Sequence, residues 1–189
     1  MTAEYWQLRI GEYLEAELRH EGESSNLRIP DDWWLTDAPI ENYRTLVVTA
    51  GRRVARPPDF FYYNVLPFVS DRFKGTVEAG FDYGGEFHRA SLLLKGGKHV
   101  EANPYWYFRL FSRLDGVDPE RSEIEFFQGT TRPKVVWQLR LNARALQGRH
   151  IFRLNKIEAI FVSEELRSAL ESAGLHAAFS PAEEFRLGW

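Results

Sequence analysis

The sequence contains no cysteine and a single methionine among its 189 residues. Without cysteine there can be no disulfide scaffold, no zinc site built on thiolates, no iron–sulfur cluster and no cysteine nucleophile. Its apolar runs are too short to cross a bilayer, and its first residues lack both the basic start and the apolar core of a secretory signal. We therefore expect a cytoplasmic protein that needs no cofactor and no metal.

Length and composition predict one folded domain that spans residues 1–189. A chain of 189 residues has the usual size of a single domain and can bury a substantial core. Hydrophobic residues make up 44% of the chain and aromatic residues 15%, which excludes a disordered chain.

Acidic residues gather near the N-terminus. The formal net charge is −3, but residues 1–43 hold ten acids and three bases, so this part carries −7 and the remainder +4. A negative total argues against general nucleic-acid binding, which depends on Lys and Arg. The acidic part can steer a basic partner, although a solvent-exposed helix or loop explains the same charges.

Strand-like segments between turn residues predict an α+β fold with a mainly antiparallel sheet and few helices. The clearest alternation, at Val135, Trp137, Leu139 and Leu141, predicts one face of a half-buried strand. Residues 12–23 fit a short helix or a strand equally well. The predicted strands occupy residues 4–10, 45–49, 91–94, 105–110, 124–127 and 134–141.

Two stretches of the chain resemble each other. FVSDRFKGTVEAG at 68–80 and FVSEELRSALESAG at 161–174 share an apolar strand end, a serine, an acid and a closing glycine. Serine is a favoured helix N-cap, an acid suits the first turn, and glycine suits the left-handed end. We expect a capped helix at about 163–173. The similarity indicates either a structural duplication or two helices with the same capping chemistry.

Few residues form patterns that suggest chemistry. Glu86 and His88 are two apart, which on a strand places them on one face, and they would serve a small hydrolase-like enzyme. A second alternative is nucleic-acid binding through Arg52, Arg53 and Arg56, which precede an aromatic run. No catalytic or metal-binding residue is assigned.

A protein-binding surface is the remaining hypothesis. Adjacent Trp33 and Trp34 lie in a polar, acidic stretch, and in an extended backbone they cannot both point into the core. Tryptophan is favoured at protein interfaces. The predicted partner-binding residues are Glu12, Glu15, Glu17, Glu21, Glu23, Asp31, Asp32, Trp33 and Trp34.

Three motifs occur in a recognisable order. They are Val69-Ser70-Asp71 within LPFVSDRF, Asp118 with Ser122 after a central strand, and the segment from Ile151 to Phe179. Together they resemble the myxobacterial-type immunity protein family of bacterial polymorphic toxin systems, formerly a domain of unknown function. The resemblance covers about residues 60–181. It departs from the family pattern at Ala177, where glycine is common.

The resemblance implies a non-catalytic protein that neutralises a cognate toxin or effector by direct contact. It carries over no catalytic residue. It names neither the toxin nor the interface, and it leaves the oligomeric state open.

Overall fold

Strands are the main secondary structure and helices are few, which confirms the predicted α+β class. The computed structural model describes residues 4–9, 16–20, 46–50, 58–63, 66–94, 98–99, 104–111, 113–155 and 157–188. In these ranges two α-helices occur, α1 at Asp71–Glu78 and α2 at Glu164–Ser172, with a 3-10 helix η1 at Ala182–Glu184. α2 is the helix predicted near the C-terminus.

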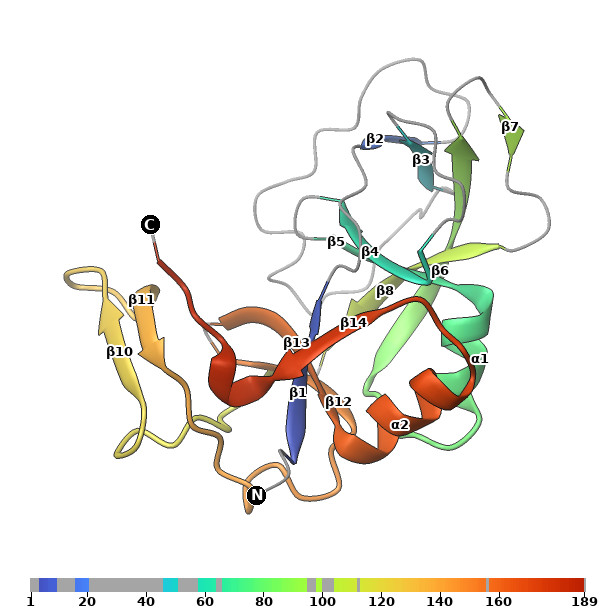
Figure 1. The fold of residues 1–189 in the computed structure, drawn as a ribbon. Coiled ribbons are helices and arrows are strands. Elements are labelled where there is room, and N and C mark those ends of the chain that lie inside the picture. Colours follow the sequence, from blue (N-terminus) through green and yellow to red (C-terminus); the bar gives the residue numbers. More distant parts are fainter. Residues whose placement is uncertain are drawn as a thin grey trace.

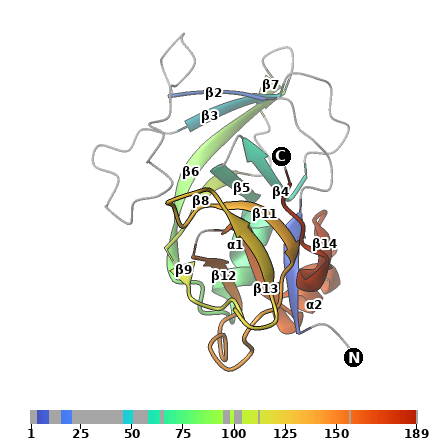
Figure 2. The ribbon, with the colours of Figure 1, turned by 90° about the vertical axis from the view of Figure 1, so that its left-hand side faces the viewer.

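The strands form two larger sheets and one separate hairpin (Figure 1 and, turned by 90°, Figure 2). The pairs β3–β6 and β9–β12 are parallel, and the other pairs in the sheets are antiparallel. The first sheet has the order β14 (Ala178–Pro181), β1 (Tyr5–Arg9), β13 (Ile157–Ser163), β12 (Ile151–Leu154) and β9 (Arg113–Leu114). The second has the order β2 (Ala16–His20), β3 (Leu46–Ala50), β6 (Gly85–Leu94), β8 (Tyr105–Leu110), β5 (Leu66–Ser70) and β4 (Phe60–Tyr63), with β7 (Lys98–His99) beside β6. The hairpin consists of β10 (Glu123–Phe126) and β11 (Pro133–Gln138).

Four of the six predicted strands match these elements to within one residue at each end, and the other two differ in length. β6 begins at Gly85, six residues before the predicted start at 91. β2 occupies part of the segment for which helix and strand were both open. β11 ends at Gln138, so the predicted strand at 134–141 is too long.

Both faces of the first sheet are buried. On one face, Ile160 and Val162 of β13 pack in a core with α1, α2 and strands of the second sheet. On the other face, Phe161 packs in a second core with Val136 of the hairpin and Phe185 near the C-terminus. Because side chains alternate along a strand, a run of apolar residues such as β13 serves both cores.

Each helix begins at a serine that ends a strand. Ser70 and Ser163 have φ −72° with ψ 162° and φ −72° with ψ 161°. Each hydroxyl accepts a hydrogen bond from the amide three residues on, at 3.2 Å in both cases. Gly174 follows α2 with φ +65°, the predicted left-handed helix end. Gly80 after α1 does not adopt that conformation, so this detail of the prediction is wrong.

The two capped helices belong to larger units with the same topology. Hairpin β4–β5 leads into α1, and hairpin β12–β13 leads into α2. The antiparallel order is β6–β8–β5–β4 around α1 and β14–β1–β13–β12 around α2. β8 follows its helix in the sequence, whereas β1 comes from the other end of the chain. The similarity seen in the sequence is therefore part of a duplicated four-stranded unit.

The register places a similar sequence at the same point of each unit. Trp106 lies opposite Val69 and Trp6 lies opposite Val162, each one residue before the capping serine. The tryptophans belong to YWYFRL at 105–110 and YWQLRI at 5–10. The duplication thus extends to a pair of strands that no local similarity around the helices would reveal.

Candidate functional site

Most residues predicted to bind a partner lie outside the described part of the chain. Glu17 lies in β2, where it pairs with Thr49 of β3. The nucleic-acid candidates Arg52, Arg53 and Arg56 also lie outside the described ranges. The same holds for Glu12, Glu15, Glu21, Glu23, Asp31, Asp32, Trp33 and Trp34.

Glu86 and His88 lie on the same face of β6, as their spacing predicts. His88 Nε2 lies 2.6 Å from Glu86 Oε1, and Arg109 Nη1 of β8 donates to the same oxygen at 3.0 Å. The side chain of Arg109 is 4% exposed and that of Glu86 38%. The structure thus adds a buried arginine that sequence spacing did not reveal, because Arg109 reaches Glu86 across the sheet.

The arrangement holds Glu86 as an ionised partner. Burial raises the pKa of the Glu86 carboxyl, but hydrogen bonds from His88 and Arg109 and their charges outweigh burial, so the pKa lies below its ordinary 4.5. A general acid or base works best with a pKa near the working pH. Glu86 therefore fits a structural ion pair better than proton transfer near neutral pH.

This ion pair gives a prediction about acid stability. Because the folded pKa of Glu86 is below the unfolded value, its stabilising effect is present above that value and is lost as pH falls through the folded pKa. Glu86→Gln should therefore lower the free energy of unfolding more at neutral pH than below about pH 4. Urea titrations at both pH values measure this, with Glu184→Gln in parallel as an exposed acid removed elsewhere. A loss that is equal at both pH values contradicts the prediction.

A second cluster has the residue types of a catalytic triad without its geometry. His150 Nδ1 lies 3.0 Å from Ser163 Oγ and 3.1 Å from Glu165 Oε2. In a triad the two ring nitrogens divide these roles, one facing the nucleophile and the other facing the acid. Here both partners meet the same nitrogen, and Ser163 Oγ also caps α2. The cluster is a helix cap with an added histidine.

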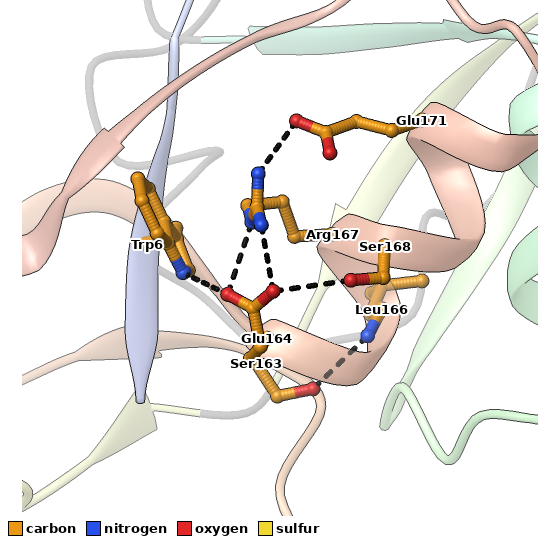
Figure 3. A network of polar contacts seen from close by, with 7 residues as sticks. All are labelled: Trp6, Ser163, Glu164, Leu166, Arg167, Ser168 and Glu171. Atoms are coloured by element: carbon orange, nitrogen blue, oxygen red, sulfur yellow. Dashed lines mark hydrogen bonds and ion pairs between the residues drawn. The ribbon is translucent and has the colours of Figure 1, made fainter. Parts of the chain in front are cut away.

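A polar network joins β1 to the start of α2 (Figure 3). Glu164 accepts hydrogen bonds from Trp6 Nε1 at 2.6 Å, from Arg167 at 2.6 and 3.0 Å, and from Ser168 Oγ at 3.1 Å. The hydrogen bonds from Arg167 do most to hold the pKa of Glu164 below its ordinary range. Arg167 also lies over the Trp6 ring, 4.3 Å from its centre, and pairs with Glu171 at 2.7 Å.

The same network recurs at the start of α1. Trp106 Nε1 donates to Asp71 at 3.0 Å, and Lys74 lies 4.8 Å from the centre of the Trp106 ring. Lys74 pairs with Glu78 at 2.5 Å. Because both units carry the network, we interpret it as part of the framework that fixes each helix on its sheet. It does not distinguish one end of the molecule as a site.

Exposed hydrophobic side chains gather on the hairpin of residues 123–138, which we call the aromatic hairpin. Among the described residues, the large hydrophobic side chains that are exposed are Trp137 at 57%, Phe126 at 43% and Phe127 at 38%. In Figure 1 this hairpin lies apart from α1 and α2, on the other side of β1. Single exposed apolar residues are common on protein surfaces, whereas contiguous exposed patches mark interaction sites. Trp137 is the largest and the most exposed of the three side chains, so it is the strongest candidate contact on this hairpin.

The position of Trp137 corrects the predicted strand face. Val136 is 1% exposed and Leu139 is fully buried, so Trp137 does not share a buried face with Leu139. The register passes from Gln138 opposite Glu123 to Val136 opposite Ile124, and thus skips Trp137. Such a bulge turns a side chain away from the alternation of a regular strand. Alternation alone could not reveal this exposure.

Among the described residues, no group of three or more His, Asp or Glu side chains is placed to hold a metal ion. Among the helices described, none is long and apolar enough to span a membrane.

The fold and the exposed hairpin together define the kind of protein. It is a strand-rich α+β protein with no triad geometry at its Ser–His–Glu cluster and with exposed aromatic residues of the type found in protein interfaces. The chain belongs to the immunity protein family Imm11, whose model matches residues 4–183. The predicted family is confirmed, and the match reaches beyond the predicted 60–181 to include β1. No curated protein matches the chain.

Proposed function

We propose that this chain binds a cognate toxin or effector domain and neutralises it by direct contact, without catalysis of its own. Membership of an immunity protein family over residues 4–183 carries this proposal. The geometry adds support, because Glu86 is held as an ion pair and His150 lacks the arrangement of a catalytic base. The site of action would be the cytoplasm, where the toxin would otherwise harm its producer.

Neutralisation by contact requires an interface of sufficient size. Stable protein complexes bury about 1,200 to 2,000 Å² in total, with a buried anchor and a polar rim. The acidic residues of the N-terminal part would steer a basic toxin surface. Trp33 and Trp34 would supply buried contacts. The complex could cover the toxin's active site or hold the toxin in an inactive state.

Co-expression tests the proposed function. We expect the cognate toxin to be a C-terminal domain encoded next to this chain, and it would be induced in cells with and without the chain. We expect growth arrest without the chain and normal growth with it, because a bound toxin cannot act. Catalytically inactive toxin, produced in the same cells, controls for the burden of expression. Growth arrest that persists with well-expressed chain contradicts the proposal.

The predicted contacts are tested separately by binding. Trp33→Ala combined with Trp34→Ala should raise the dissociation constant for that domain at least tenfold if these side chains are anchors. Replacing the acids Glu12, Glu15 and Glu17 by Gln should slow association, most clearly at low salt. Unchanged binding of the tryptophan variant removes the anchor role while leaving the immunity function intact.

A further inference from the structure

We propose that the aromatic hairpin is a toxin-docking surface with Trp137 as its central anchor. This inference rests on the proposed immunity function and names the surface that performs it. Trp137 is 57% exposed, and burial of a tryptophan at an interface contributes more than burial of most other residues. Phe126 and Phe127 are also exposed, nearer the turn of the same hairpin, where Phe126 lies opposite Pro133.

The hairpin lies outside the duplicated framework. The first unit consists of β4, β5, α1, β6 and β8. The second consists of β12, β13, α2, β14 and β1. β10 and β11 lie between β8 and β12 in the sequence and pair with each other as a separate sheet. The framework residues recur in both units, so their role in folding is enough to explain them. The exposed aromatic residues belong to the inserted part, where folding gives no reason to expose them.

The hairpin is fixed on the body of the protein. The Val136 amide donates to the Leu187 carbonyl at 2.8 Å, and the Leu187 amide donates back at 3.3 Å. Val136 also packs in the core with Phe152 and Phe161. The bulge that exposes Trp137 therefore follows directly after an anchored residue. A backbone held this way loses little freedom on binding, which favours affinity.

The charges of the hairpin define the surface it fits. Residues 123–138 carry two acids and two bases. Lys134 pairs with Glu125 at 2.6 Å, and Arg132 lies 5.8 Å from the centre of the Phe127 ring. A balanced hairpin is complementary to an uncharged surface and gives no preference for a strongly charged one. The occupant we infer is an apolar recess on the toxin with a polar rim of low net charge.

A cavity lies beside the hairpin at Phe126. It has a volume of about 420 Å³, and Ile124, Phe126 and Pro133 form its hairpin wall. Asp115, Asn142 and Asn155 add polar groups to its lining, and Trp137 is not part of it. A toxin side chain that packs on Phe126 would enter this cavity, so Phe126 is a second contact of the proposed surface, separate from Trp137.

Biolayer interferometry with the full chain tests the inference. The probe is the purified toxin domain used in the co-expression experiment. Trp137→Ala should raise the dissociation constant at least tenfold, mainly through faster dissociation, and Phe126→Ala should weaken binding less. The effect of Trp137→Ala should change little with salt, because the contact is apolar. Ser172→Ala, at the end of α2, is the control and should bind like the wild type.

The outcomes separate this inference from the proposed function. If the wild-type chain does not bind the domain, the immunity function fails. If the wild type binds and Trp137→Ala binds equally well, the docking surface is wrong while the function stands. Unfolding temperatures of the variants check that each is folded, and Phe127→Ala provides a second reading at the hairpin. If the wild type self-associates and Trp137→Ala abolishes this, the inference is also overturned, because the hairpin would then bind a second copy of the chain.

Discussion

Phe73→Ala is expected to lower the free energy of unfolding by about 3–5 kcal/mol, the range for a fully buried phenylalanine. Phe73 of α1 is completely buried, and its ring stacks on Phe60 with centres 6.0 Å apart. It lies in the core that also contains Leu166 and Leu170 of α2. Removing the ring therefore leaves a cavity where both units meet. Denaturant titration measures the change.

An exposed phenylalanine provides the matched control. Phe127→Ala on the aromatic hairpin removes the same ring from a position that is 38% exposed. Substitutions at such surface positions usually change stability by no more than about 0.5 kcal/mol. If Phe73→Ala costs no more than Phe127→Ala, then Phe73 does not have the core position assigned to it.

Gly85→Ala should lower the free energy of unfolding by about 1–3 kcal/mol, the usual cost of an overpacked site. A Cβ at Gly85 would lie 2.5 Å from the Arg109 carbonyl oxygen and 3.2 Å from the Leu110 Cα. Both atoms belong to the backbone of β8, which pairs with β6 and β5 and cannot move aside alone. The shift would also disturb the Arg109–Glu86 ion pair. Thermal unfolding measures the loss.

Gly75→Ala is the control for this prediction. Gly75 lies in the middle of α1, and a Cβ there would meet no atom within 4 Å. Alanine is favoured over glycine inside a helix, so this variant should gain about 0.5–1 kcal/mol. Opposite signs for the two substitutions are expected. A Gly85→Ala protein as stable as the wild type would show that β6 and β8 are further apart than described.

The candidate chemistry was only partly visible in the sequence. The spacing of Glu86 and His88 predicted their shared face, because side chains alternate regularly along a strand. The third member, Arg109, lies 23 residues from Glu86, and only sheet pairing brings the two together. The aromatic hairpin was missed for the opposite reason. Its bulge breaks the alternation from which Trp137 was predicted to be buried.

The sequence by itself determined the family, the α+β class and both capped helices. These depend on local physics, since serine caps, acids in the first turn and apolar spacing act within a few residues. Tertiary structure decided that the capped helices belong to duplicated units, because β1 and β13 pair across more than 150 residues. It also decided which aromatic residues face solvent. This chain has no cysteine, so pairing between distant strands and burial determine both features. No short segment of the sequence contains that information.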